Sequence, residues 1–349
     1  MITVLVAAYQ GEKYLEEQLD SILNQTVTDI QVLISDDGST DGTWELARQY
    51  AAKFPGRVHC MRHPRAEGAE IGKQTGSDSS DAGISGETEL FQGEPDQEVS
   101  AVSQMNPAAA NFFWLLSRAE GDYIMLSDQD DVWREDKAER MMFHMRKAEK
   151  KWGADTPILL FSDAKVVDSK LREIAPSFLK YQHINPSRTS LNEILVENPV
   201  TGGAVMFNAA LLPYVSQAPR QCMMHDWWMA LTASCFGHVQ CVKEPLYSYR
   251  QHGSNTLGAK RTGSLEDMRE RMKRGEQVRE QYERMFSQAS CFLEQFGRQL
   301  TKQQREALRA YLSLPCQRLR GRMKTVRRYH FHKSSRIQTA AMCFTIPRR

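Results

Sequence analysis

The sequence has few cysteines and no pattern that would pair them. The seven cysteines are odd in number and scattered, and none of them forms a Cys-x-x-Cys pair. This spacing excludes a disulfide framework and indicates reduced thiols, as in the cytosol. Each cysteine is therefore expected to behave as a small, buried apolar group.

Long hydrophobic runs are also missing. No window approaches the roughly 18 to 20 apolar residues that a membrane-spanning helix needs. No basic segment precedes the first apolar run, Ile2-Thr3-Val4-Leu5-Val6, so a signal peptide is not expected either. A G-x-G-x-x-G fingerprint is absent after that run, which argues against a dinucleotide oxidoreductase. Together these absences predict a cytoplasmic protein.

Acidic residues are absent from the last 40 positions, which hold ten Lys/Arg, although the net charge of the chain is only +2. Residues 260–349 carry 22 Lys/Arg against 8 Asp/Glu, and the rest carries 23 against 35. A basic tail on an acidic body indicates an anionic partner, either a membrane surface or a nucleic acid. No recognised nucleic-acid motif accompanies the tail, so a nucleic-acid partner is not expected.

The first 65 residues alternate between apolar runs and amphipathic stretches. Strands are expected at 2–8, 30–34 and 57–61, with helices near 14–23 and 42–54 between them. Alternating strands and helices predict right-handed βαβ units and a mostly parallel sheet flanked by helices. Ligands of such sheets bind beyond the carboxyl ends of the strands.

Residues 66–105 break this alternation with nine acids, one lysine and few large apolar groups. We expect a disordered surface insertion there, because it holds too little apolar surface to order itself. Further on, helices are expected at 106–116, 135–150 and 226–236, and strands at 122–126, 157–162, 202–207, 239–242 and 246–249. The chain is expected to turn helical from residue 264, with a capping box at Thr301-x-x-Gln304 and a basic helix near 318–324.

The acidic run Asp128-Gln129-Asp130-Asp131 follows the strand predicted at 122–126. Two aspartates at positions i and i+2 after a strand can reach the same side of a turn and hold Mg²⁺ or Mn²⁺ against a diphosphate. The alternative is a solvated acidic turn that caps the following helix, the role expected of Asp131.

A second acidic pair, Asp36 and Asp37, follows the strand predicted at 30–34. Short polar side chains there can accept hydrogen bonds from a nucleobase imide or a ribose hydroxyl. Ala8 and Tyr9, at the end of the first strand, are placed to line the same pocket. A plain turn and ordinary packing of Tyr9 remain the alternatives.

Four motifs in order resemble those of the family 2 glycosyltransferases, and within that family the bacterial rhamnosyltransferase-like subgroup. They are Val6-Ala7-Ala8-Tyr9-Gln10-Gly11, Leu19-x-Ser21-Ile22-x-x-Gln25, Ser35-Asp36-Asp37-Gly38-Ser39-x-Asp41-Gly42-Thr43 and Leu126-Ser127-Asp128-Gln129-Asp130-Asp131-Val132-Trp133. The resemblance covers roughly residues 1–255 and implies the GT-A nucleotide-sugar-binding fold. The 66–105 insertion departs from the family pattern, in which this link is usually short.

The resemblance also implies a set of site residues. Asp226, in His225-Asp226-Trp227-Trp228, resembles the general base of the family. The residues expected to bind the nucleotide-sugar are Ala8, Tyr9, Asp36, Asp37, Arg65, Asp128, Gly202, Gly203, Trp227 and Arg250. The expected metal ligands are Asp130, Asp128 and His252, with Asp128 shared between the metal and the ribose.

Several of these assignments have structural alternatives. The Gly202-Gly203 turn can lie near the donor sugar and acceptor, or be a plain tight turn. Trp227 and its neighbour Trp228 can form a wall for a sugar ring, or pack in the core. Arg250 can face phosphate, and His252 can be a metal ligand or an ordinary histidine.

The expected function is inverting transfer of a sugar from a nucleoside-diphosphate-sugar to a hydroxyl of a glycan or lipid-linked acceptor, in cell-surface polysaccharide synthesis. The subgroup favours a rhamnose donor, and the cofactor is Mg²⁺ or Mn²⁺. We expect a catalytic domain at 1–258 and a basic helical extension at 259–349. Leu314, Leu319 and Met323 of the extension are candidates for contact with an anionic membrane. The alternatives are a helical cap on the catalytic domain, for the extension, and a non-catalytic nucleotide-sugar-binding protein, for the whole chain.

Overall fold

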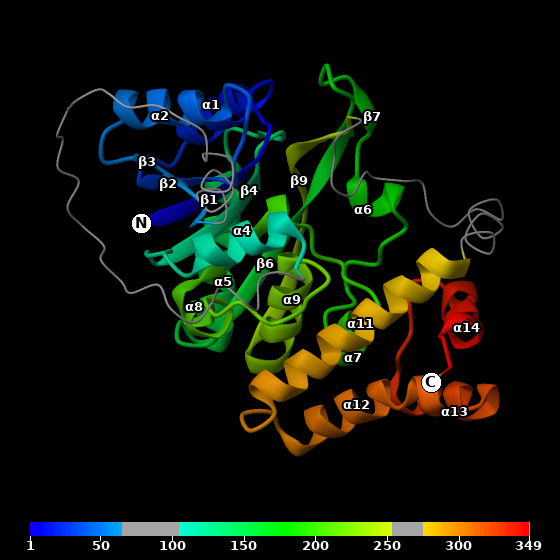
Figure 1. Cartoon of the computed structure of the whole chain (residues 1–349). Coiled ribbons are helices and arrows are strands. Elements are labelled where there is room, and N and C mark those ends of the chain that lie inside the picture. Colours follow the sequence, from blue (N-terminus) through cyan, green and yellow to red (C-terminus); the bar gives the residue numbers. More distant parts are fainter. Residues whose placement is uncertain (65–104, 253–274, 349) are drawn as a thin grey trace, which may run out of the picture.

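The computed structural model describes residues 1–64, 105–252 and 275–348 (Figure 1). Four expectations lie outside these residues: the placement of Arg65, the insertion up to residue 104, the domain boundary at 258/259 and the start of a helix at 264. Met105, the last residue assigned to the insertion, is 4% exposed and belongs to the core.

One nine-stranded sheet forms the centre of the described structure, with strand order β3-β2-β1-β4-β8-β6-β9-β5 and β7 paired to β6. The strands are β1 Ile2–Ala8, β2 Ile30–Asp36, β3 Val58–Arg62, β4 Tyr123–Asp128, β5 Val132–Trp133, β6 Ile158–Val167, β7 Glu173–Ala175, β8 Val205–Asn208 and β9 His238–Arg250. Among them β5, β7 and β8 run antiparallel to the others. The sheet is thus mostly parallel, as expected.

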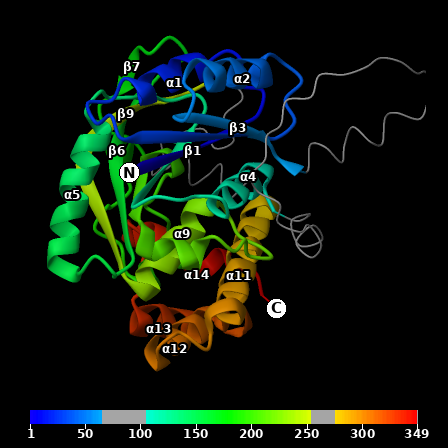
Figure 2. The same cartoon turned by 90° about the vertical axis from the view of Figure 1, so that its left-hand side faces the viewer.

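Helices cover the sheet and extend beyond it (Figures 1 and 2). The helices near the sheet are α1 Leu15–Leu23, α2 Thr43–Lys53, α4 Pro107–Leu116, α5 Lys137–Trp152, α6 Phe178–Tyr181, α7 Leu191–Ile194, α8 Leu212–Val215 and α9 His225–Phe236. The C-terminal helices are α11 Gly275–Phe296, α12 Lys302–Leu312, α13 Leu319–Tyr329 and α14 Arg336–Thr345. Short 3₁₀ turns are η2 Gly202–Ala204, η3 Ala209–Leu211 and η4 Leu314–Cys316.

Three local expectations need correction. The strand expected at 202–207 begins as the 3₁₀ turn η2 and becomes β8 only at Val205. The two strands expected at 239–242 and 246–249 are one strand, β9, whose pairing with β6 shifts register around Pro245. A proline cannot donate to the ladder, so an irregularity is expected there. Asp131 does not cap α5, because the N-cap position belongs to Asp136 and Asp131 is buried.

The C-terminal helices pack against the rest of the chain through α11. In both views α9 lies between the sheet and α11 (Figures 1 and 2). The ring of Trp228 on α9 meets Phe292 and Phe296 of α11, with ring centroids 5.2 and 6.1 Å apart. The capping box at Thr301 and Gln304 is present as expected. In the described part of the chain, every helix is too short or too polar to span a bilayer.

Candidate active site

The carboxyl ends of β1, β2 and β4 meet at one edge of the sheet. The register pairs Ala8 with Asp36 and Ala7 with Asp128, so these residues lie level with one another. This alignment follows from parallel pairing of apolar strands, because each strand carries its polar residues just past its buried run. The sheet therefore collects polar groups from segments that lie far apart in the sequence.

The β2 end of this edge is a tight polar turn. Asp36 is fully buried and its carboxylate accepts the backbone N–H of Ser39 at 3.2 Å. The backbone N–H of Asp37 donates to the carbonyl of Ala8 at 2.9 Å, which ties β2 to β1. The Asp37 carboxylate lies 3.0 Å from Nδ1 of His63. The acids expected at the nucleobase pocket thus lie beside Ala8.

Tyr9 is held by its backbone while its ring stays exposed. The side chain of Gln129 accepts the Tyr9 N–H at 2.7 Å and donates to the Tyr9 carbonyl at 2.8 Å. The Tyr9 side chain is 56% exposed, so ordinary core packing does not account for it. Gly11 is needed beside this clamp, because a Cβ there would lie 2.3 Å from Oε1 of Gln129.

Asp128 and Asp226 lie on either side of the Gly202-Gly203 turn. The backbone groups of Gly203 and Gly202 lower the pKa of Asp128 and Asp226 respectively, and a Cβ on Gly203 would lie 3.3 Å from Oδ2 of Asp128. Asn198 donates its side-chain amide to the Asp226 carboxylate at 3.2 Å. Desolvation by burial raises the pKa of Asp226 to about 7, well above its usual 3.8. A carboxylate with such a pKa can take a proton near neutral pH.

The turn between the two acids requires glycine at both positions. A Cβ on Gly202 would lie 2.7 Å from Nε2 of His225, and one on Gly203 would lie 2.8 Å from Oδ2 of Asp131. Such distances are shorter than a Cβ tolerates. Both glycines are buried against site side chains, and their contact with a donor sugar stays a prediction.

A buried lysine lies beneath the acidic run. Lys137, the first residue of α5, donates its ammonium to the carbonyl of Gly203 at 2.6 Å. Burial raises the pKa of Asp131, and the neighbouring Asp130 and Asp128 raise it further. Within the described residues, Oδ2 of Asp131 has no hydrogen-bond partner, although Lys137 acts on it electrostatically. Lys137 thus interacts electrostatically with two of the aspartates, Asp128 and Asp131, while burial lowers its own pKa to about 7.

Asp130 and His252 form a pair that suits a divalent cation. Oδ2 of Asp130 lies 2.7 Å from Nε2 of His252, and both side chains are nearly buried. A carboxylate oxygen and an imidazole nitrogen side by side are ligand types that Mn²⁺ accepts, and Mg²⁺ needs only one or two carboxylates besides phosphate oxygens. In the described residues no three such side chains are grouped as a complete metal site. The pair therefore fits an ion whose remaining ligands come from a diphosphate and water.

Arg250 is held by backbone carbonyls and one carboxylate beside the acidic run. Its guanidinium donates to the carbonyls of Asp130 at 2.8 Å and Ser169 at 3.0 Å, and to the carboxylate of Glu17. Its ring neighbour is Tyr14, 4.7 Å away. The side chain is 3% exposed, so in this structure it braces the acidic loop, and a contact with phosphate stays a prediction.

The two tryptophans after Asp226 differ in environment. Trp228 is fully buried against α11, so the expectation that it could line a sugar site is wrong. Trp227 is half-buried and donates its indole N–H to the carbonyl of Ile194 at 2.7 Å. That hydrogen bond fixes the ring, and its contact with a sugar stays a prediction.

Three residues that position the site escaped the sequence analysis: Gln129, Lys137 and Asn198. A signal existed for Lys137, since it shares a helix face with Met141 and Met145 at spacings of four, and that face is buried. Gln129 contacts Tyr9 and Asn198 contacts Asp226, and no local sequence pattern predicts contacts between residues so far apart in the chain.

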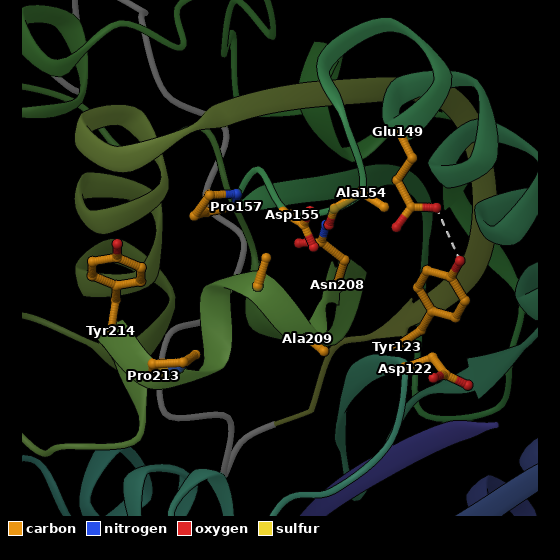
Figure 3. A pocket seen from close by; sticks show the side chains of 11 residues that line it. Asp122, Tyr123, Glu149, Ala154, Asp155, Pro157, Asn208, Ala209, Pro213 and Tyr214 are labelled. Atoms are coloured by element: carbon orange, nitrogen blue, oxygen red, sulfur yellow. Dashed lines mark hydrogen bonds between the residues drawn. The ribbon is translucent and has the colours of Figure 1, made fainter.

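A pocket of about 620 Å³ lies elsewhere, at the opposite edge of the sheet (Figure 3). It is lined by residues from the start of β4 and the end of β8, including Tyr123, whose hydroxyl donates to Glu149 at 2.9 Å. None of the predicted site residues lines it. Because parallel sheets bind ligands at the carboxyl ends of their strands, this pocket is not the candidate active site.

Comparisons with known sequences agree with the motifs. The family model described as Glycosyl transferase family 2 matches residues 3–82. The dTDP-rhamnosyl transferase RfbG of Shigella flexneri is 23% identical over 265 residues, which cover 73% of this chain and 74% of that protein. The putative teichuronic acid biosynthesis glycosyltransferase TuaG of Bacillus subtilis is 24% identical over 52% of this chain and 55% of its own length.

Comparison with solved structures concerns the fold. The crystal structure of S. aureus TarS matches with a TM-score of 0.51 and 16% identity, over 90% of this chain and 43% of that one. A TarS fragment in complex with UDP matches with a TM-score of 0.50 and 16% identity, over 89% of this chain and 69% of the fragment. The expected GT-A fold, with helices appended at the C-terminus, is thereby confirmed.

Proposed function

We propose that this chain, which resembles the family 2 glycosyltransferases in sequence and in fold, is an inverting enzyme that uses a nucleoside-diphosphate-sugar. The observation that carries the proposal is the convergence of Asp128 and Asp226 on the Gly202-Gly203 turn, beside the Asp130–His252 pair. Asp128, on the donor side, and Asp226, the proposed base, are then both held next to the same glycine turn. A non-catalytic binder would have no need of the second carboxylate.

The transfer is a single displacement. The acceptor hydroxyl oxygen forms a bond to the anomeric carbon as the bond from that carbon to the diphosphate oxygen breaks. The hydroxyl proton passes to the carboxylate of Asp226, and the nucleoside diphosphate leaves with the bonding electron pair. Asn198 and the backbone of Gly202 orient that carboxylate. Fixed geometry of this kind supplies much of the rate.

The donor nucleotide is assigned to the end of β1 and β2. Asp36 and Asp37 face the base and ribose there, with Ala8 and Tyr9 as neighbours. Asp128 extends this surface towards the ribose. Asp130 and His252 would hold Mg²⁺ or Mn²⁺, with Asp128 nearby, and the ion would neutralise charge on the leaving diphosphate.

The donor and acceptor classes rest on the relatives. A rhamnose donor is favoured by the name of the Shigella relative. The acceptor is proposed to be a hydroxyl of a glycan or lipid-linked sugar, with the enzyme working in the cytoplasm on cell-surface polysaccharide. Residues 1–258 form the proposed catalytic domain and 259–349 its basic extension.

A membrane contact is proposed for the basic extension. Leu314 is fully buried and Leu319 half-buried, so of the three leucine and methionine side chains suggested by the sequence only Met323 is exposed. The larger apolar surface is on α14, where Ile337 is 63% and Phe344 67% exposed. These two residues are seven apart and therefore share a helix face. With basic neighbours they suit an anionic lipid surface.

The test of the proposed function compares two aspartate variants. With a panel of nucleotide-sugars and Mn²⁺, Asp226→Asn should lose transfer by at least about a hundredfold while still binding donor, because only the proton acceptor is removed. Asp130→Asn should instead weaken metal-dependent donor binding, because a ligand of the ion is lost. Transfer is measured by product release and binding by thermal shift.

The control is Asp155→Asn, which removes a carboxylate from the pocket at the opposite edge of the sheet. It should leave both readouts unchanged. Transfer by Asp226→Asn at the wild-type rate would make the base assignment wrong. Equal donor affinity of Asp130→Asn and the wild type in Mn²⁺ would make the metal assignment wrong.

A further inference from the structure

Lys137 is buried although it lies on a helix whose outer face is strongly charged. Its side chain is fully buried, and among the buried polar residues of the chain it is the one lysine described. Placing an ammonium inside a protein costs much free energy unless acceptors and counter-charges surround it. The contacts of Lys137 should therefore show which groups stabilise the buried ammonium.

Those contacts lead to the acidic site. The ammonium donates to the carbonyl of Gly203 at 2.6 Å and lies over the rings of Trp133 and Tyr247, 3.8 and 4.5 Å from their centroids. Burial lowers the pKa of Lys137 to about 7, while electrostatic interaction with Asp131 and Asp128 raises it and partly offsets the burial. Two aromatic faces and two carboxylates leave the ammonium one orientation, towards the glycine turn.

The turn held by Lys137 is the element that touches both functional acids. A Cβ on Gly203 would lie 3.3 Å from Oδ2 of Asp128, and the backbone of Gly202 acts on the carboxylate of Asp226, whose pKa it lowers. The two glycines open a three-residue 3₁₀ turn, in which a shift at one peptide moves the next. A displacement of the Gly203 carbonyl would therefore change the separation of the donor-side acid and the base.

We propose that Lys137 is a positioning residue for glycosyl transfer: by holding the carbonyl of Gly203, it sets the relative placement of Asp128 and Asp226. The proposal rests on the proposed function, because the rate of sugar transfer is the measurement that depends on the relative placement of Asp128 and Asp226. Lys137 itself touches no reacting atom in this account.

The experiment is a double-mutant cycle on Lys137→Met and Gly203→Ala. Methionine keeps the length of the side chain but loses the charge and the donor, and the alanine methyl, which would lie 2.8 Å from Oδ2 of Asp131, displaces the same turn. Each single variant should lower kcat by at least about tenfold, as a misplaced catalytic group does, with donor KM within about threefold. The double variant should lose little more than either single one, because both act through one turn.

Lys150→Met is the matched control, an exposed lysine on the same helix, and its kcat should equal that of the wild type. A wild-type kcat for Lys137→Met, or multiplicative losses in the double variant, would overturn the proposal. Where Lys137→Met does not fold, Gly203→Ala is compared in the wild-type and Lys137→Arg backgrounds. A different kcat ratio in the two supports coupling, and an equal ratio overturns it. A wild-type chain that transfers no sugar contradicts the proposed function instead.

Discussion

At the scale of single residues, burial decides what the site carboxylates can do. Asp226 has a pKa near 7 because it is desolvated, while Asn198 and two backbone groups only partly offset that effect. Burial likewise raises the pKa of Asp131, and the neighbouring Asp130 and Asp128 raise it further. The sequence alone therefore does not show whether a given aspartate acts as a base, as a metal ligand or as a buried counter-ion.

The raised pKa of Asp226 predicts a pH dependence of the wild-type enzyme. Below about pH 7 the carboxyl holds its proton and cannot accept another from the acceptor hydroxyl. We expect kcat/KM to fall by about tenfold for each pH unit below 7 and to level off above it. Steady-state rates from pH 5 to 9, with circular dichroism to check the fold, measure this. A flat profile between pH 5 and 8 would contradict the assignment.

At the scale of elements, the helix pair α13 and α14 is fixed to the rest of the fold on one side and exposes apolar side chains on the other. Arg322 of α13 is buried and donates to the carbonyls of Leu314 at 2.9 Å and Ile346 at 2.6 Å, so it joins η4 and the end of α14. Ile337 and Phe344 on the outer face of α14 are left exposed. The pair is fixed to the fold on one side and presents apolar surface on the other.

The exposed face of α14 predicts binding to anionic vesicles. Replacing Ile337 and Phe344 by serine should reduce co-sedimentation with phosphatidylglycerol-rich vesicles by at least about tenfold, because each buried apolar side chain contributes roughly 1.5 kcal/mol or more. Ile174→Ser, which removes an isoleucine that is 47% exposed on β7, is the control. Equal sedimentation of all three proteins would remove the membrane from the proposed function.

At the scale of the whole molecule, the C-terminal helices share a core with the sheet. Trp228 and Phe236 of α9 pack against Phe296, and Trp228 also meets Phe292. Farther along, Tyr311 contacts Phe286 and Phe331, which extends the same core through α12. The helix that carries Asp226, the proposed general base, therefore packs against the helices of the extension.

This shared core predicts a large loss of stability in Phe292→Ala. Phe292 is fully buried, so the cavity should cost about 3 to 5 kcal/mol of the free energy of unfolding. Phe344→Ala removes an exposed ring and should cost less than about 0.5 kcal/mol. Urea denaturation of the two variants makes the comparison. A loss below 1 kcal/mol for Phe292→Ala would mean that the extension is not part of the cooperative core.

Local order in the sequence was enough to predict the elements on which the site is built. Apolar runs of strand length placed β1, β2 and β4, and the polar residues just after them named Asp36 and Asp128, because a parallel sheet brings such ends to one edge. Helical spacing likewise predicted α1. The family resemblance added Asp226 and His252, which no local pattern singles out.

Tertiary structure decided what each polar group contacts. Arg250 lies against backbone carbonyls, Trp228 lies in the core, and Lys137 lies under the glycine turn. Each placement depends on contacts with segments that are distant in the sequence, and in some cases about a hundred residues away. Burial then shifted the pKa values of the site carboxyl groups. The sequence by itself determined which side chains arrive at the edge of the sheet, and packing determined which of them can accept a proton, hold an ion or support a neighbour, because desolvation and hydrogen bonding are properties of the folded surroundings.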